Sequence, residues 1–148
     1  MPTNFYDNNA EQLAEQYLSK SFEDVHDAWL DLLPAILAKS NPRILDLGAG
    51  AGRDSKYLSR QGKADPVHVV AVEPAQLLAE IGQQQTKGLN VTWLTDSLPA
   101  LDVVSRQEIS FDLILLSAVW MHIPPSDRHR AMRKLANLLK PGAKLVIS

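Results

Sequence analysis

The sequence contains no cysteine, little net charge and no long apolar run. The absence of cysteine rules out disulfides and thiolate metal ligands and is typical of a cytoplasmic protein. No apolar stretch approaches the roughly 20 residues that a membrane-spanning helix needs. A formal net charge of −2 gives no electrostatic reason to expect binding to nucleic acid or to an anionic membrane. We therefore expect a cytoplasmic location and neither of these two partners.

The composition is that of one globular domain. Hydrophobic residues make up 45% and charged residues 22% of the chain, as is ordinary for a folded protein. A length of 148 residues is enough for one hydrophobic core. We expect a single domain over residues 1–148, in which a helical segment over 1–40 precedes a core over 43–148.

The N-terminal segment has the pattern of two amphipathic helices. Apolar residues recur at helical spacing over residues 7–20, and again from Ser21, a suitable N-cap, to the Asn-Pro pair at 41–42. Because these helices precede the first strand, we expect them to cover the sheet or its ligand edge, where Tyr6 and Tyr17 would face a bound molecule. The apolar stripe of the second helix is predicted to point inward and comprises Phe22, Val25, Trp29, Leu32, Leu33 and Ile36.

Strands and helices alternate in the rest of the chain. Helices are predicted over residues 53–61, 74–85 and 126–140. Such alternation implies a parallel sheet with right-handed crossovers, which is a doubly wound α/β fold with helices on both faces. Short apolar runs predict about five strands, over residues 44–47, 68–72, 90–94, 111–116 and 144–147.

A glycine-rich turn follows the first predicted strand. Its pattern is D-x-G-x-G-x-G over residues 46–52, and a helix is predicted to begin at Arg53. Glycine permits positive φ and lets a ligand approach the backbone, while the start of a helix attracts negative ligand atoms. The turn therefore indicates a nucleoside-cofactor site, although a strand-to-helix turn without a ligand gives the same pattern.

Carboxylates follow the next two predicted strands. Ligands bind doubly wound sheets beyond the carboxyl ends of the strands, and Glu73 ends the second strand while Asp96 follows the third. Glu73 can accept hydrogen bonds from both hydroxyls of a ribose, and Asp96 can accept one from an exocyclic amine such as that of adenine. With Asp46, these side chains favour a positively charged ligand rich in hydrogen-bond donors over a pyrophosphate.

The glycine spacing also argues against a dinucleotide. The fingerprint G-x-G-x-x-G needs a third glycine where this chain has Arg53, since its first two are Gly48 and Gly50. No arginine or lysine stands at residues 74–76 to receive a 2′-phosphate. An NAD-dependent oxidoreductase and a non-catalytic α/β binding module are nevertheless kept as alternatives.

Five segments in order resemble the motifs of class I S-adenosylmethionine-dependent methyltransferases. Residues 46–52 resemble motif I, and the later segments are 69–74, 95–99, 111–117 and 138–143. Residues 5–10 resemble, more weakly, the N-terminal helix of many small-molecule methyltransferases. The resemblance implies a Rossmann-like sheet of strand order 3-2-1-4-5. It also implies S-adenosylmethionine as cofactor, S-adenosylhomocysteine as its product, and methyl transfer to a small-molecule acceptor.

The resemblance also implies the residues of a cofactor site. The motif I residues would hold the methionine part of the cofactor, the residue ending the second strand its ribose, and those after the third strand its adenine. A serine at the end of the fourth strand would lie beside the cofactor. The implied residues are Asp46, Gly48, Ala49, Gly50, Gly52, Arg53, Glu73, Pro74, Asp96, Ser97, Leu98 and Ser117.

Few reacting groups are needed, because a sulfonium already carries an activated methyl group. Holding the acceptor in line with that group, away from water, supplies most of the rate enhancement. His122 is the candidate base because it follows the fourth strand on the ligand side, and Trp120 is a candidate acceptor-facing aromatic. A structural role for His122 is the alternative, and the other histidines are assigned no role. No cluster of histidine and carboxylate residues has metal-ligand spacing.

The family pattern is incomplete at the C-terminal end. Class I methyltransferases usually continue past the fifth strand into an antiparallel pair, whereas this sequence stops at Ser148. We expect a fragment that carries the cofactor half of such a domain and lacks the sixth and seventh strands. The outer edge of its fifth strand would be open to self-association.

Overall fold

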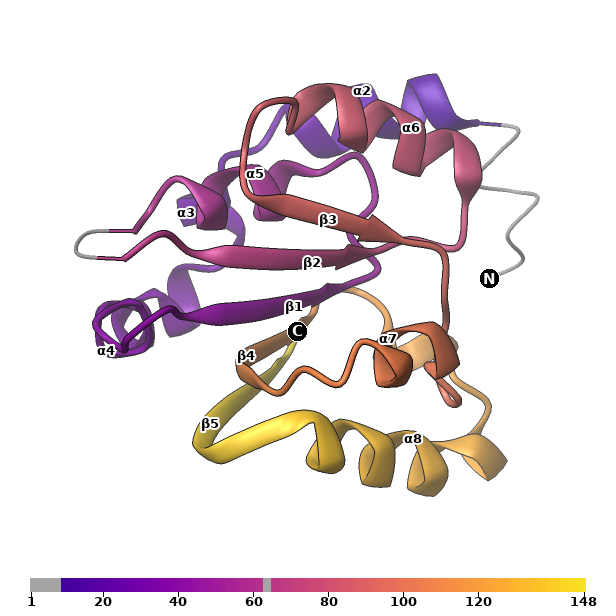
Figure 1. The fold of residues 1–148 in the computed structure, drawn as a ribbon. Helices are drawn as coiled ribbons and strands as arrows, with labels where there is room; N and C mark the ends of the chain where they lie inside the picture. Colours follow the sequence, from indigo (N-terminus) through magenta and orange to yellow (C-terminus); the bar gives the residue numbers. More distant parts are fainter. Residues whose placement is uncertain (1–8, 63–64) are drawn as a thin grey trace.

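The structure, a computed structural model, describes residues 9–62 and 65–148. It contains a five-stranded parallel sheet between two layers of helices (Figure 1). The order β3-β2-β1-β4-β5 confirms the predicted doubly wound α/β fold. The strands are β1 (Arg43–Leu47), β2 (His68–Val72), β3 (Val91–Leu94), β4 (Phe111–Leu116) and β5 (Leu139–Ile147).

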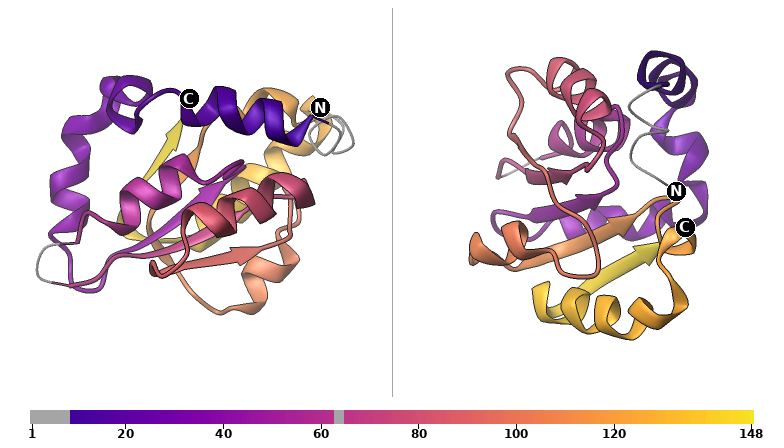
Figure 2. Two further views of the ribbon diagram at one scale, coloured as in Figure 1. Left: turned by 90° about the horizontal axis from the view of Figure 1, so that it is seen from above. Right: turned by 90° about the vertical axis from the view of Figure 1, so that its right-hand side faces the viewer.

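The two layers of helices follow from the alternation of side chains along the strands. Helices α5 (Arg53–Ser59) and α6 (Gln76–Gln85) lie with the N-terminal segment on one face, and α7 (Asp102–Arg106) and α8 (Pro125–Leu138) lie on the other (Figure 1, Figure 2). On β1, Ile44 packs with α5 and the N-terminal segment, whereas Leu45 and Leu47 pack with α7 and α8. None of the helices in residues 9–62 and 65–148 is long and apolar enough to cross a membrane.

The N-terminal segment differs from the two predicted helices. Helix α2 (Ala10–Leu18) corresponds to the first, but the second is divided into α3 (Phe22–Val25), the 3₁₀ helix η1 (Asp27–Leu32) and α4 (Leu33–Leu37). Ser21 caps α3 as predicted and accepts a hydrogen bond from the Asp24 N–H at 3.1 Å. Pro34 lies in the first turn of α4, where its missing N–H is tolerated, but inside one continuous helix it would break the hydrogen-bond ladder.

This division changes which side chains of the segment are buried. Val25 and Leu32 are 38% and 41% exposed, so their predicted inward position is wrong. The 3₁₀ turn has fewer residues per turn than an α-helix, which takes the apolar stripe out of phase. The stripe residues that do lie in the core are Phe22, Trp29, Leu33 and Ile36.

The start of β5 also differs from the prediction. Phe111 pairs with Leu139 and Leu113 pairs with Lys144, so extra residues of β5 bulge out between these two pairs. The bulge contains the Pro141-Gly142 pair, which the sequence suggested as the break between helix and strand. The strand therefore begins at Leu139, directly after α8, rather than at Lys144.

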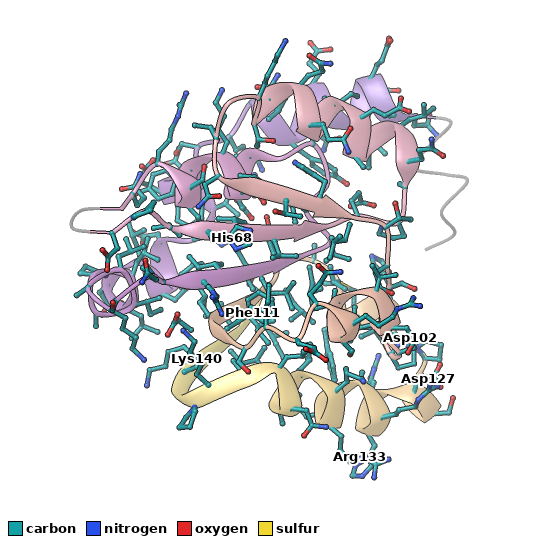
Figure 3. All side chains as sticks on the ribbon, viewed as in Figure 1. His68, Asp102, Phe111, Asp127, Arg133 and Lys140 are labelled. Carbon is teal, nitrogen blue, oxygen red and sulfur yellow. The ribbon has the colours of Figure 1, made fainter. Side chains whose placement is uncertain are left out.

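A buried carboxylate joins three strands at their amino ends. Asp112 is 2% exposed, and its Oδ2 accepts hydrogen bonds from the Arg43 backbone N–H and from Lys140 Nζ, each at 2.9 Å. Lys140 and the neighbouring Phe111 are labelled at this end of the sheet in Figure 3. The bonds fix β1, β4 and β5 relative to one another at the end of the sheet opposite the glycine turn.

The outer edge of β5 is open within the described residues, where the strand pairs with β4 alone. Self-association through it stays a prediction.

Gly82 holds α6 close to β3. A methyl group added at Gly82 would overlap the Trp93 ring, which a 2.9 Å hydrogen bond to the Thr86 hydroxyl keeps in place. Gly82→Ala should lower the free energy of unfolding by about 1–3 kcal/mol, measured by urea denaturation. Gln83→Ala, an exposed site on the same helix, should change it by less than about 0.5 kcal/mol. Equal stability of the two variants would contradict the close packing.

Candidate cofactor site

A cavity of about 700 Å³ lies beyond the carboxyl ends of β1 to β4. Its wall comes from the glycine turn, from the residues after β2, β3 and β4, and from α2 and α3. Doubly wound sheets bind ligands at this place, and the volume is in the range of small-molecule sites. The structure brings these predicted site residues together on the wall: Tyr17, Gly48, Ala49, Gly50, Arg53, Glu73, Pro74, Asp96, Ser97, Leu98, Ser117 and His122.

Four predicted site residues lie elsewhere or are not described. Asp46 is buried behind the turn, Trp120 packs with the apolar cluster beneath α8, and Tyr6 lies outside the described residues. Gly52 has a φ of +93°, and a Cβ added there would lie 3.1 Å from the Gly82 Cα. Gly52 therefore does not line the cavity. Its lack of a side chain allows α5 to pack closely against α6.

Three amides of the glycine turn donate hydrogen bonds to the end of β2. Gly48 and Ala49 donate to the Val72 carbonyl at 2.9 and 3.0 Å, and Gly50 donates to Glu73 Oε1 at 2.8 Å. Gly48 and Gly50 have φ values of +71° and +56°, which glycine adopts without strain. Dinucleotide folds use free amides here to bind a pyrophosphate. The engaged amides thus count against the NAD alternative.

Glu73 joins the glycine turn to the segment after β2. The residue is 6% exposed, and its Oε2 accepts a hydrogen bond from the Ala75 N–H at 2.8 Å, while Oε1 binds the turn. Its carboxylate lines the cavity, at the place where the sequence predicts a partner for ribose hydroxyls.

Tyr17 brings α2 over the turn. A Cβ added at Gly50 would lie 3.7 Å from the Tyr17 ring, and the Tyr17 carbonyl accepts a hydrogen bond from Arg53 Nη1 at 3.2 Å. Burial, together with the negative charge of Glu73, raises the pKa of the Tyr17 hydroxyl. Helix α2 thus covers the ligand edge of the sheet, as the sequence analysis expected.

Asp96 stabilises a helix that the sequence analysis missed. Its Oδ1 accepts a hydrogen bond from the Ser97 N–H, and its Oδ2 accepts one from the Val104 N–H in α7, each at 2.9 Å. The residue at the N-cap of α7, Leu101, has no capping side chain. Asp96 therefore supplies the cap from outside the helix, so no adjacent capping signal was available in the sequence.

A buried polar network behind the cavity was also missed. His26 is 1% exposed, and its Nδ1 accepts a hydrogen bond from Trp29 Nε1 at 3.2 Å. Because an indole can only donate, the proton of His26 lies on Nε2, which donates to Asp54 Oδ2 at 3.0 Å. Arg53 Nε donates to the other oxygen of Asp54 at 2.9 Å. Burial raises the pKa of Asp54, but the hydrogen bonds from His26 and Arg53 outweigh it and hold that pKa below its ordinary value.

Asp46 lies directly behind the glycine turn and is 1% exposed. Its Oδ2 accepts a hydrogen bond from the Ser55 hydroxyl at 2.7 Å, and its Oδ1 has no hydrogen-bond partner in the described residues. Burial, followed by the negative charge of Asp54, raises the pKa of Asp46 to about 8. These effects favour the neutral form of Asp46 and the ionised form of Asp54.

Residues 44–142 match a family model described as a methyltransferase domain. The chain belongs to this methyltransferase family. The match confirms the resemblance to class I S-adenosylmethionine-dependent methyltransferases, and it comes from the segment that carries the sheet and most of the cavity wall.

Individual methyltransferases are also similar to this chain in sequence and structure. The chain is 26% identical over 151 residues to an uncharacterized methyltransferase of Alkaliphilus oremlandii, covering 98% of this chain and 62% of that protein. It is 31% identical over 121 residues to a ubiquinone biosynthesis O-methyltransferase of Xylella fastidiosa, covering 80% of this chain and 46% of that protein. A TehB-like SAM-dependent methyltransferase from Corynebacterium glutamicum superposes with a TM-score of 0.64 at 26% identity, over 93% of this chain and 72% of that one. The chain thus spans less than two thirds of these two curated relatives.

Protonation of Asp46 makes the stability of the methyltransferase domain depend on pH. The folded state binds one more proton than the unfolded state between about pH 3.9, the pKa of an unfolded Asp, and about pH 8. The extra proton on Asp46 therefore adds its full contribution to the free energy of unfolding below about pH 3.9. This contribution is lost as the pH rises from there to about pH 8. Asp46→Asn should therefore lose less thermal stability than the wild type between about pH 5 and pH 8.

The control for this measurement is Asp102→Asn, which removes an exposed carboxylate (Figure 3). Its thermal unfolding temperature should follow that of the wild type across the pH series. A curve for Asp46→Asn that runs parallel to both would contradict the assignment of the raised pKa.

Proposed function

We propose that this domain binds S-adenosylmethionine and transfers its methyl group to a small-molecule acceptor. The main support for this proposal is the glycine turn. Its amides donate hydrogen bonds to Val72 and Glu73, and residues with carboxylate side chains line the cavity beside it. Such a site suits a cationic ligand with hydroxyl and amine donors better than an anionic one. Membership of the methyltransferase family supports the same cofactor, and the similar protein of Corynebacterium glutamicum is described as SAM-dependent.

The residues of the cavity fit this cofactor. Glu73 would accept the ribose hydroxyls, Asp96 with the Ser97 and Leu98 backbone would hold the adenine, and Arg53 would face the methionine carboxylate. Asp46 lies behind the turn, and its Oδ1, which has no hydrogen-bond partner in the described residues, would interact with the amine of the cofactor through water. The bound cofactor supplies an activated methyl group.

The remaining residues of the wall hold the acceptor and exclude water. Tyr17 covers the turn from α2, and Ser117 and His122 line the cavity from the segment after β4. The His122 side chain makes no hydrogen bond or ion pair within the described residues, so its ring is available to take a proton. The relative from Xylella fastidiosa is named an O-methyltransferase, and an O–H acceptor would need such a base. A cytoplasmic location belongs to the same proposal, supported by the cysteine-free sequence.

Calorimetric titration tests the proposal against its two alternatives. S-adenosylmethionine and S-adenosylhomocysteine should bind the domain, and NAD should not. Binding of NAD alone would favour the oxidoreductase, and absence of binding by the first two ligands would reject the proposal. Cofactor binding without methyl transfer to any member of an acceptor library would favour the non-catalytic module.

Glu73→Ala should weaken the binding of S-adenosylhomocysteine by about 1–3 kcal/mol, because a buried charged group that accepts hydrogen bonds is lost. Glu80→Ala removes an exposed carboxylate from α6 and should leave the affinity unchanged. Calorimetry measures both affinities, and thermal unfolding checks that both variants fold. Unchanged affinity in folded Glu73→Ala would remove Glu73 from the ribose role.

His122→Gln should slow methyl transfer by about 100-fold or more, the ordinary contribution of a general base, and leave cofactor affinity unchanged. The rate is followed as formation of S-adenosylhomocysteine with an acceptor taken from the library. His129→Gln, an exposed position on α8, is the matched control and should react at the wild-type rate. If His122→Gln also did so, the role of His122 would be structural.

A further inference from the structure

The Lys20 ammonium group on the cavity wall has no counterion among the described residues. Glu73 and Asp96 accept backbone N–H groups, and Asp54 and Arg53 pair with each other at 2.9 Å. Lys20, between α2 and α3, lines the same cavity and is exposed. Within residues 9–62 and 65–148 its ammonium group makes no hydrogen bond and no ion pair. The positive charge of Lys20 is therefore available to an anionic group of a molecule that enters the cavity.

Three more side chains of the cavity wall make no hydrogen bond within the described residues: those of Gln16 and Tyr17, and that of His122 from η2 (Trp120–His122). Gln16 and Tyr17 line the cavity from α2, and no side-chain hydrogen bond of either is made within the described residues. His122 lines it from η2 with a ring that is likewise unbound. Val25, 38% exposed, adds apolar surface to the same wall. The wall therefore combines a cation, a titratable ring and apolar surface that the cofactor residues do not use.

We propose that the acceptor is a small hydroxy acid, whose carboxylate binds Lys20 and whose hydroxyl faces His122. This inference rests on the proposed methyl transfer and names the substrate class. An acceptor that displaces water from the cavity lowers the local dielectric, which strengthens the attraction between the carboxylate and the Lys20 ammonium. The apolar body of the acid packs against Val25 and Ile123.

The reaction balances with these groups. The hydroxyl oxygen of the acceptor forms a bond to the methyl carbon as the sulfur–carbon bond breaks, and the electron pair of that bond stays on sulfur. The hydroxyl proton moves to the His122 ring and from there to water. Lys20 forms no bond in this step, so it determines which acceptor binds rather than how fast the bound acceptor reacts.

The methionine carboxylate of the cofactor is the competing partner for Lys20. Arg53 lies closer to the glycine turn, since it begins α5 directly after it and donates to the carbonyl of Tyr17, whose ring covers Gly50. A guanidinium is therefore already present for the cofactor carboxylate, which leaves Lys20 for the acceptor. If Lys20 binds the acceptor, a change at Lys20 alters the affinity for the acid. If it binds the cofactor, the change alters the affinity for S-adenosylhomocysteine.

Matched acids and amides test the proposal. The domain, loaded with S-adenosylhomocysteine, is titrated with para-hydroxybenzoate, para-hydroxyphenylacetate and lactate, and with the amide of each. At least one acid should bind about five- to tenfold more tightly than its amide, equivalent to a single partly screened ion pair. This preference should shrink as salt is added.

Three variants complete the experiment. Lys20→Met should abolish the preference for the acid and keep the affinity for S-adenosylhomocysteine, whereas Lys20→Arg should keep both. Lys39→Met removes an exposed lysine that does not line the cavity and should behave like the wild type. Thermal unfolding checks that each variant is folded.

The outcomes that overturn the proposal are distinct from those that reject the proposed function. If Lys20→Met weakens S-adenosylhomocysteine binding and keeps the preference for the acid, Lys20 belongs to the cofactor. If no acid binds more tightly than its amide, or none binds at all, the acceptor is not of this class although the cofactor still binds. Failure of S-adenosylhomocysteine to bind the wild type would reject the proposed function and this inference with it.

Discussion

The Glu73 carboxylate joins the two strand ends on which the cavity depends. One oxygen accepts the Gly50 N–H in the turn after β1, and the other accepts the Ala75 N–H after β2. If either segment moved, a buried carboxylate oxygen and an amide would both lose their partner, at about 1–3 kcal/mol for each unsatisfied group. The Val72 carbonyl adds two bonds from the same turn. These hydrogen bonds therefore hold the turn against the end of β2.

The same bonds decide what the turn can bind. Amides that point at β2 cannot also point at a phosphate, so the face left to a ligand is shaped by carboxyl groups. Behind it, Asp54 is kept ionised by His26 and Arg53, and its charge disfavours ionisation of Asp46. Two neighbouring buried carboxyl groups rarely ionise together. A positive charge placed beside the turn would favour the ionised form of Asp46.

The sequence predicted the sheet, and which residues meet at its carboxyl edge, because both depend on residues close together in the chain. Glycines and carboxylates directly after strands reach the same edge of a parallel sheet whatever the rest of the chain does. Helix α7 was missed because its cap, Asp96, stands outside the helix, and the network of His26 and Asp54 joins residues 28 positions apart. Gly52 was predicted as a site residue but does not line the cavity. It belongs to the motif by position, but its lack of a side chain is needed by the packing of α5 against α6.

The two halves of the cavity wall are attached to the fold in different ways. The strand ends are fixed by the register of a parallel sheet, whereas α2 is attached through buried alanines against α6 and through the hydrogen bond from Arg53 to the Tyr17 carbonyl. Gln16 and Lys20 line the cavity, and their side chains make no hydrogen bond within the described residues. Substitutions at these two positions should therefore leave the glycine turn in place, because within the described residues neither side chain makes a hydrogen bond to the turn or to Glu73.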